Sequence, residues 1–305
     1  MHVLITGVAS RIGRLVAERL VADPGVATVT GLDARVVRPP LPGMRFVRAR
    51  LHQPEWTALL DTTDVVVHVA GLIGWPLRRR IDTALVADTR QVLRAVESAA
   101  VPRLVVVNNA TVYGPQPVGP LHEDARIRGH QAGAYARDRA LVSDFLDLMA
   151  DRAGDRVITR LRTAWVCGPR YVAPVRHFRR GPVLVCGCEA RLFQVVHEED
   201  LCAAILLAVG RDLPGIYNVS ADSGVTFHEL AALLGDNRTC VPLAWATLMA
   251  WWRWRWLGRR TPPGWLRTLY RCQPVDTSKL RATGWTPLHS SRETLLDALA
   301  ALDAQ

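Results

Sequence analysis

The stretch that decides the fold is HVLITGVASRIGRLVAERL, residues 2–20. Residues 3–6 have a buried strand pattern, and a helical pattern covers 14–22. In a strand-turn-helix context, glycines allow a tight turn and close helix packing, while N–H groups at the helix start can receive a pyrophosphate. The sequence therefore predicts a phosphate-binding turn formed by Gly7, Ser10, Arg11, Ile12 and Gly13.

An acidic residue follows at the end of the next strand pattern. Asp33 stands 20 residues after Gly13. A carboxylate at this position accepts hydrogen bonds from both ribose hydroxyls of NAD and repels the 2′-phosphate of NADP. We therefore expect NAD as the cofactor. NADP stays open because Arg35 is close by and a guanidinium pairs well with a phosphate.

Apolar strand patterns alternate with longer helical patterns through the first half of the chain. Continuous apolar strands separated by helices predict an α/β fold, a Rossmann-type doubly wound parallel sheet with helices on both faces. Ligands of such sheets bind beyond the carboxyl ends of the strands. The predicted strands are 3–6, 26–33, 45–47, 65–70, 104–108 and 157–160, and further helices are predicted over 83–100 and 134–152.

The pattern becomes irregular after about residue 168. It mixes strand-like pieces at 182–185 and 192–196 with helices at 199–209 and 227–234 and a Trp/Arg-rich segment over 245–265. We expect a dinucleotide-binding domain over 1–168, its sheet completed by about 190–220. A smaller C-terminal substrate-binding lobe is expected over 169–189 and 221–305.

Composition narrows the function classes. The chain has 305 residues, 49% of them hydrophobic, and a net charge of +10, which fits a folded globular protein. The positive residues are dispersed and almost all are Arg, Lys279 being the only lysine. Without a nucleic-acid-binding signature we expect no nucleic-acid partner, and an anionic small-molecule substrate explains the charge equally well.

Several further absences shape the expectations. The six cysteines show no paired spacing, so we expect buried free thiols and no metal. The chain begins directly on a strand pattern, and no run of about 18 apolar residues occurs. A cytoplasmic location is the expectation.

Further motifs, taken in order, resemble the NAD-dependent epimerase/dehydratase family, the extended short-chain dehydrogenase/reductases, over nearly the whole chain. Each piece is modest, and their order and spacing carry the resemblance. The motifs are TGVASRIG (6–13), HVAG (68–71), NNATVYG (108–114), YARDR (135–139), LRTAWVCGPR (161–170), FQVVHEEDL (193–201), GIYNVS (215–220) and DTSKLRATGWTP (276–287).

The resemblance implies a set of catalytic positions. In typical members a Ser or Thr, a Tyr and a Lys cooperate, because a phenol with a pKa near 10 needs adjacent positive charge before it can take a proton near neutral pH. Tyr135 matches the tyrosine, Arg139 stands at the lysine position and Asn109 at the hydroxyl position. Thr111 can substitute for the missing hydroxyl.

The resemblance also implies binding positions. Tyr135 and Arg139 are expected to contact the cofactor as well, and Ser10 stands where the family has a middle glycine, adding bulk beside the pyrophosphate. The other implied residues are Val69, Ala70 and Gly71 for the cofactor and Trp165, Arg170 and Phe193 for the substrate. The helices over 83–100 and 134–152 imply a homodimer.

Two other features have competing interpretations. His197 and Asp200 look catalytic in isolation, but the family resemblance implies that they tie a strand to the following helix. Within the Trp/Arg-rich segment, one helical face is apolar, which is typical of a packed lid or dimer surface and also fits contact with a membrane surface or lipid-like substrate. That face holds Trp245, Leu248, Met249, Trp252 and Trp256, with Trp251, Trp254 and Trp265 elsewhere and Arg253, Arg255, Arg259 and Arg260 among them.

Two functions are consistent with this sequence. The first is an NAD(P)-dependent oxidoreductase or epimerase that acts on an alcohol or ketone carbon of a sugar nucleotide or related small molecule. The second is a catalytically degenerate dinucleotide-binding protein with a regulatory or structural role, because two of the three family catalytic residues are replaced.

Overall fold

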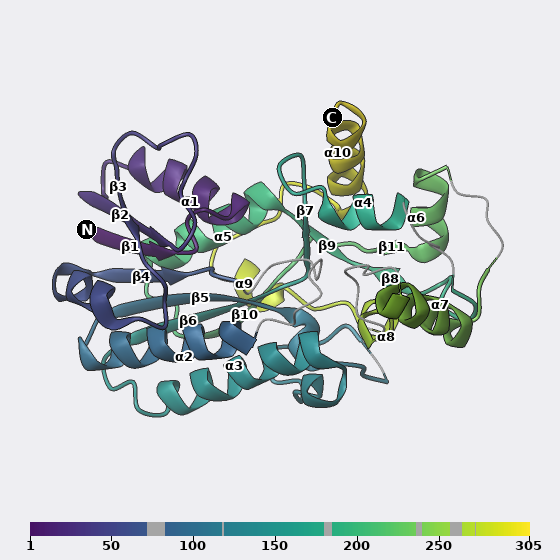
Figure 1. The fold of residues 1–305 in the computed structure, drawn as a ribbon, viewed down its shortest axis with the longest axis horizontal. Coiled ribbons are helices and arrows are strands. Elements are labelled where there is room, and N and C mark those ends of the chain that lie inside the picture. The colour runs from purple at the N-terminus through teal and green to yellow at the C-terminus, as the bar shows by residue number, and fades with distance from the viewer. Residues whose placement is uncertain (72–82, 118, 180–184, 236–239, 257–263, 272) are drawn as a thin grey trace.

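The computed structural model describes residues 1–71, 83–117, 119–179, 185–235, 240–256, 264–271 and 273–305. Among these residues a seven-stranded, wholly parallel sheet forms the centre, in the order β10-β6-β5-β4-β1-β2-β3 (Figure 1). The predicted Rossmann-type fold is therefore confirmed. Its strands are β1 (His2–Thr6), β2 (Thr28–Asp33), β3 (Met44–Arg48), β4 (Val65–His68), β5 (Arg103–Asn109), β6 (Val157–Thr163) and β10 (Gly215–Val219).

The strand order creates a switch point between β1 and β4. From β1 the chain adds β2 and β3 on one side, then returns to place β4, β5 and β6 on the other. The connections after β1 and β4 therefore leave in opposite directions, and the carboxyl ends of these two strands are where a sheet of this kind is expected to hold its ligand in a crevice. All four residues of β4, VVVH, are buried, as expected of a strand covered on both faces.

Helices cover the two faces of the sheet (Figure 1). On one face α1 (Arg11–Val21) packs against α5 (Glu198–Gly210), and on the other α2 (Thr83–Ser98) packs against α3 (Ala134–Ala150). Each pair encloses its own hydrophobic cluster with the sheet. Short 3-10 helices lie in three connections: η1 (Pro54–Thr62), η2 (Ala110–Tyr113) and η3 (Gly129–Gln131).

The predicted strand over 192–196 is divided in two. β8 (Leu192–Phe193) pairs with β11 (Val225–Thr226), whereas β9 (Val195–His197) pairs with β7 (Trp165–Cys167). Gln194 lies at the break, where its side-chain amide donates to the carbonyl of Ala221 and accepts from the N–H of Val275. Within 190–220, β10 lies in the seven-stranded sheet, whereas β8 and β9 lie in two separate two-stranded sheets on either side of Gln194.

The remaining helices belong to the C-terminal half of the chain. Helices predicted over 199–209 and 227–234 appear as α5 and α6, and the Trp/Arg-rich segment forms α7 and the start of α8. No helix in the described ranges has both the length and the apolar character needed to cross a membrane. The helices here are α4 (Ala173–Arg179), α6 (Phe227–Leu233), α7 (Leu243–Trp256), α8 (Gly264–Arg271), α9 (Ser278–Arg281) and α10 (Ser291–Asp303).

A third hydrophobic cluster joins α4, α6, α8 and α10 to β8 and β9. Its centre is aromatic: the Phe178 and Phe193 ring centroids are 5.2 Å apart in an edge contact, and Phe227 lies against both. The predicted limits of the two domains stay a prediction. Most of the predicted strand at 182–185 and the residues Arg259 and Arg260 lie outside the described residues.

Candidate active site at the sheet's switch point

Gly7 brings two backbones together at the switch point. It has a φ of +80°, and a Cβ added there would lie 2.6 Å from the Cα of Ala70. Only glycine fits both the left-handed backbone and this close approach. The predicted phosphate-binding turn is thus placed directly beside Val69, Ala70 and Gly71, which follow β4.

Ser10 turns its side chain into the helix. It is the N-cap of α1, and its hydroxyl accepts a hydrogen bond of 3.0 Å from the N–H of Gly13. The hydroxyl thus satisfies one of the N–H groups that a helix start leaves without a partner. The bulk expected beside a pyrophosphate is directed toward α1, and Arg11 and Ile12 form the first positions of the helix.

Asp33 ends β2 next to the turn and is almost completely buried. Its carboxylate accepts from the N–H of Ala9 at 3.0 Å and from the N–H of Arg35 at 2.9 Å. The guanidinium of Arg35 also contacts this carboxylate, at 3.3 Å. Arg35 is therefore engaged by Asp33, which opposes its use as a partner for a 2′-phosphate.

Arg139 connects the cofactor side of the crevice to Tyr135. It is 5% exposed on α3 and donates to the carbonyl oxygens of Gly71 and Tyr135, both at 3.1 Å. Its guanidinium carbon lies 3.4 Å from the centroid of the Tyr135 ring. The positive charge therefore stacks on the face of the phenol, an arrangement that a planar guanidinium favours over an ammonium.

Asn109 and Thr111 lie together at the end of β5. The side-chain oxygen of Asn109 caps η2 by accepting from the N–H of Thr111 at 3.0 Å. The group that Asn109 can offer a substrate is therefore its amide NH₂. The hydroxyl of Thr111 is buried and has no hydrogen-bond partner among the described residues, so a donor at this point is left for a ligand.

Four of the predicted catalytic and substrate residues, Asn109, Thr111, Trp165 and Phe193, line one recess. Trp165 forms part of its wall next to Asn109 and Thr111. The rings of Trp165 and Tyr135 are 6.0 Å apart between centroids. The full lining is Asn109, Ala110, Thr111, Ala164, Trp165, Leu192, Phe193, Gln194, Leu269, Gln273, Pro274 and Val275.

The two other predicted substrate residues differ in position. Phe193 touches the recess but is 2% exposed within the aromatic cluster, so most of its surface serves the core. Arg170 pairs with Glu18 of α1 at 2.7 Å and is not part of the recess lining. Its carbonyl oxygen accepts from the guanidinium of Arg11, which places it beside the phosphate-binding turn.

Sequence reasoning missed one wall of the site. Gln194, Leu269 and the segment 273–275 line the recess, and a second recess adjoins it along Leu192, Gln194, Pro274 and Val275. The second recess continues over Asp276, Thr277 and Ser278. The DTSK motif, which begins at residue 276, is the sequence signal for this wall, because its first three residues line the second recess.

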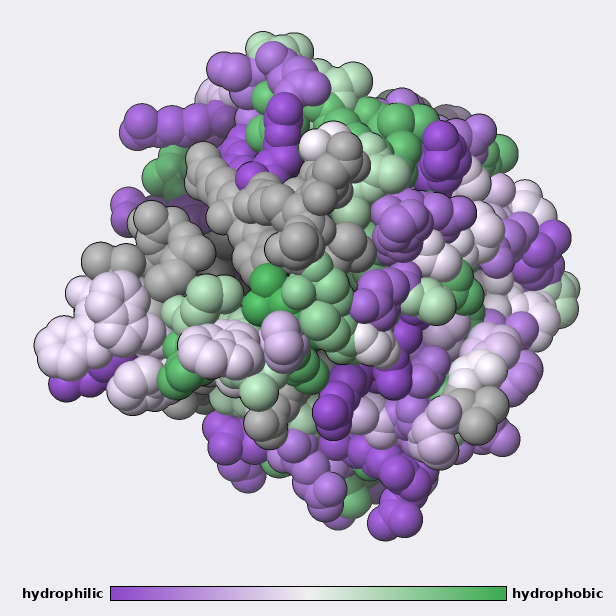
Figure 2. All heavy atoms as spheres, turned by 90° about the vertical axis from the view of Figure 1, so that its right-hand side faces the viewer, coloured by the Kyte–Doolittle hydropathy of each residue, from purple (hydrophilic) through white to green (hydrophobic). Residues whose placement is uncertain are grey.

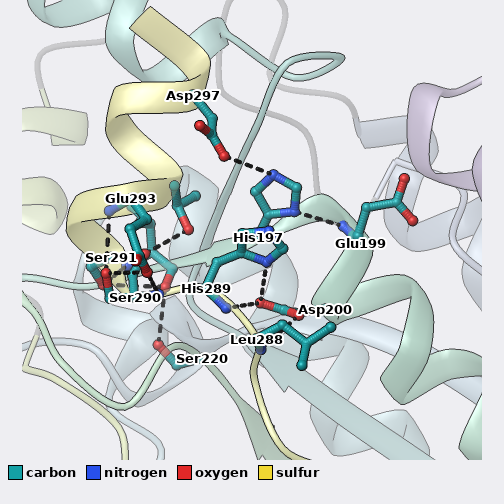
Figure 3. A network of polar contacts seen from close by, with 12 residues as sticks. His197, Glu199, Asp200, Ser220, Leu288, His289, Ser290, Ser291, Glu293 and Asp297 are labelled. Atoms are coloured by element: carbon teal, nitrogen blue, oxygen red, sulfur yellow. Dashed lines mark hydrogen bonds and ion pairs between the residues drawn. The ribbon is translucent and has the colours of Figure 1, made fainter.

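His197 and Asp200 form a structural network (Figure 3). The Nδ1 atom of His197 accepts from the N–H of Glu199 and caps α5, while the carboxylate of Asp200 accepts from the N–H groups of Leu288 and His289. The network ties β9 and α5 to the segment before α10. This arrangement supports the structural role expected of both residues.

Two groups of possible metal ligands occur among the described residues. The first group consists of His197, His289 and Asp297. The Nδ1 of His197 accepts a hydrogen bond, so in the neutral ring Nε2 carries the proton and has no lone pair to offer a metal. The second group consists of Cys186, Glu189 and Cys240. Burial, together with the neighbouring Cys186 and Glu189, raises the pKa of the Cys240 thiol to about 12, which disfavours the thiolate that a metal needs.

The cysteines agree with the expectation only in part. Cys167, Cys188 and Cys202 are free and buried, as expected, whereas Cys186 is free and exposed and Cys240 is free and half-buried. Cys272 lies outside the described residues, and Cys186 begins a turn directly after Val185. That the protein uses no metal stays a prediction.

A buried histidine links three elements near the crevice. His68, at the end of β4, is fully buried, and its two ring nitrogens lie 2.6 Å and 3.0 Å from the hydroxyls of Thr6 and Thr89. Burial lowers the pKa of His68 to about 4. The ring is therefore neutral near pH 7, held by two hydroxyls that can each donate or accept.

Comparison with known proteins identifies the family. The model of the NAD dependent epimerase/dehydratase family matches residues 3–220. The chain belongs to that family. It is 28% identical over 257 residues to an uncharacterized protein of Mycobacterium tuberculosis, Rv0501, and equally to one of Mycobacterium bovis, Mb0513, covering 79% of this chain and 67% of each relative.

Solved structures of similar fold include several sugar-nucleotide enzymes. MoeE5 in complex with UDP-glucuronic acid and NAD aligns with a TM-score of 0.76 at 20% identity, over 100% of this chain and 99% of its own. UDP-glucose 4-epimerase of Thermotoga maritima with UDP-glucose aligns with a TM-score of 0.75 at 20% identity and the same coverage. UDP-glucose 4-epimerase of Thermus thermophilus with NAD aligns at 0.73 and 22%, over 99% of both chains.

Proposed function

We propose that this member of the NAD dependent epimerase/dehydratase family is an NAD-dependent enzyme that acts on an alcohol or ketone carbon of a sugar nucleotide. One observation carries the proposal. Arg139 contacts Gly71 on the cofactor side and Tyr135 on the substrate side, and Tyr135 lies against Trp165 in the wall of the recess. Direct contacts through Arg139 and Trp165 thus link the segment after β4, the phenol ring and the wall of the recess.

The residues present fit NAD. Gly7 and Gly13 place no side chain at the two ends of the turn. A Cβ at Gly13 would lie 2.3 Å from the carbonyl oxygen of Gly7. The start of α1 offers N–H groups to a pyrophosphate, and the carboxylate of Asp33 suits ribose hydroxyls. When bound, NAD would supply a reversible acceptor for a hydride, a proton with two electrons, from the substrate carbon.

Tyr135 is the proton-transfer group in this proposal. Its phenol exchanges the proton of the substrate's reacting oxygen, and the guanidinium of Arg139, stacked on the ring, stabilises the negative charge that develops on the phenol. Arg139 is nearly buried, so water screens this charge little. Arg139 acts through its positive charge.

Thr111 and Asn109 orient the substrate. The buried hydroxyl of Thr111 and the amide NH₂ of Asn109 lie in the lining of one recess and can donate to the reacting oxygen. Trp165 provides an apolar face on which a sugar ring packs. The similar structures that hold UDP-glucuronic acid and UDP-glucose support sugar nucleotides as the class to test.

The test compares Tyr135→Phe with the unchanged protein. NAD reduction or epimer formation is measured with UDP-glucose, UDP-galactose and UDP-glucuronic acid, and NAD binding is measured by the shift in melting temperature. We expect turnover to fall by at least about a hundredfold while the NAD-induced shift is unchanged. Tyr217→Phe on β10, outside both recesses, is the matched control. Equal turnover in the Tyr135 variant and the unchanged protein would refute the proposal.

The alternative is a non-catalytic dinucleotide-binding protein. It is favoured by Asn109 and Arg139 at the hydroxyl and lysine positions, and by the use of the Asn109 carbonyl oxygen in capping η2. It predicts a melting-temperature shift with NAD and no turnover with any sugar nucleotide. Turnover that depends on Tyr135 decides against it.

We also propose a homodimer through the surface of α2 and α3, which pack together on one face of the sheet. Leu148 of α3 is 55% exposed and provides an apolar contact there. Sedimentation velocity of the unchanged protein and of Leu148→Glu tests the proposal. A monomer at all concentrations of the unchanged protein would refute it.

A further inference from the structure

Helix α7 presents its large apolar side chains to solvent. Trp245, Trp252 and Trp256 are 62%, 53% and 66% exposed, and Leu248 and Met249 are also exposed. Spacings of three, four and seven residues place all five on one face of the helix. We call these five residues the α7 face.

The opposite side of α7 carries small residues toward the protein. Ala246 is 3% exposed, and Ala250 is partly buried against the third hydrophobic cluster. A globular helix normally buries its bulkier apolar side. Here the larger side chains are the exposed ones, and Figure 2 faces this end of the molecule. Exposed apolar patches of this kind mark interaction surfaces.

Charge in this part of the sequence has one sign. Residues 237–275 contain seven arginines and neither Asp nor Glu. The side chain of Arg255 is exposed on α7, and its guanidinium carbon lies 5.2 Å from the centroid of the Trp256 ring. An arginine beside exposed indoles is complementary to a surface that has negatively charged groups next to an apolar layer.

We propose that α7 docks the protein on an anionic lipid bilayer, with the α7 face in the headgroup boundary and Arg255 at the lipid phosphates. Three of the five side chains are Trp, whose indole has an apolar body and an N–H that stays hydrated, and this suits the boundary. With 14 residues, α7 is about 21 Å long, shorter than the apolar layer of a bilayer, so it lies along the surface.

Docking by α7 would hold the substrate recess close to the bilayer. α8 packs against α7, and Leu269 of α8 lines the recess. The hydroxyl of Thr268 donates to the carbonyl of Ala132, just before α3, at 2.6 Å. Helix α8 thus joins α7 to α3, the helix that carries Tyr135 and Arg139. The docking itself is independent of the enzymatic proposal.

Vesicle flotation at low salt tests the proposal on the full chain. The vesicles are phosphatidylcholine alone, or phosphatidylcholine with about one third phosphatidylglycerol. We expect binding to the anionic vesicles and much weaker binding to the neutral ones. The double variant Trp252→Ser with Trp256→Ser should lower the partition coefficient roughly tenfold or more, and Arg255→Gln should lower it on anionic vesicles only.

The control is Leu288→Ser, which removes an 81% exposed leucine outside α7 and should bind as the unchanged protein does. Equal melting temperatures show that the variants are folded. No flotation of the unchanged protein with anionic vesicles at low salt, or equal flotation of the tryptophan variant, overturns the proposal. If the protein fails to bind vesicles and the tryptophan variant abolishes self-association in sedimentation velocity, the α7 face is an interface between copies of this chain.

Discussion

Replacing His68 with asparagine removes a side chain whose protonation opposes folding in acid. The folded protein binds a proton at His68 with a pKa of about 4, against 6.5 for a solvated histidine. Between these values the unfolded chain binds more protons than the folded one. Stability present above pH 6.5 is therefore lost as the pH falls from 6.5 toward 4.

The magnitude follows from the two pKa values. At about 1.4 kcal/mol for each tenfold difference in proton affinity, His68 removes about 2 kcal/mol of unfolding free energy by pH 5 and about 3 kcal/mol by pH 4. The physical cause is burial: the ring is fully enclosed between Thr6 and Thr89, and no carboxylate hydrogen-bonds to it.

Urea unfolding at pH 7, 6 and 5 measures the effect. His68→Asn loses stability at every pH, and the informative quantity is the difference in unfolding free energy between it and the unchanged protein. We expect this difference to shrink by about 2 kcal/mol from pH 7 to pH 5, because only the unchanged protein carries the titrating ring. His228→Asn, at an exposed histidine, is the control. A difference that is constant with pH would refute the reasoning.

Three further predictions concern the crevice. Gly7→Ala should lower the unfolding free energy by about 2 kcal/mol or more, because the methyl would lie 2.6 Å from the Ala70 Cα; urea unfolding measures this, and an unchanged stability would contradict it. Ser10→Ala should lower the unfolding free energy by about 1 kcal/mol, because the hydrogen bond that caps α1 at the N–H of Gly13 is lost. The shift in melting temperature that NAD produces should be retained, and its loss would mean that the hydroxyl faces the cofactor. Arg139→Met should lower kcat about a hundredfold whereas Arg139→Lys recovers part of it, and equal kcat in the two variants would show that the charge is not used.

The sequence was sufficient for the sheet and the crevice. The turn at residues 6–13 is local, and its glycines have few alternatives, so strand, turn and helix could be predicted together. The spacing to Asp33 placed the second strand end at the same edge. Family motifs then brought Asn109, Thr111 and Trp165 to one recess, which the structure shows.

What the sequence could not reveal depends on contacts between distant segments. The break at Gln194 arises from bonds to Ala221 and Val275, up to 81 residues away. Periodicity showed that α7 has an apolar face, but not that Ala246 would pack inward and leave Trp252 outside. Which face of an amphipathic helix is buried is decided by its neighbours.

Arginine at position 139 affects how the protein reacts with reagents that modify amines. Acylating reagents and enzymatic acetylation act on amines, so they leave this cation untouched. The chain's single lysine, Lys279, lies over the ring of Tyr217 at 4.8 Å. Coupling to a resin through amines would therefore attach the protein at that lysine or at the N-terminus and spare the crevice.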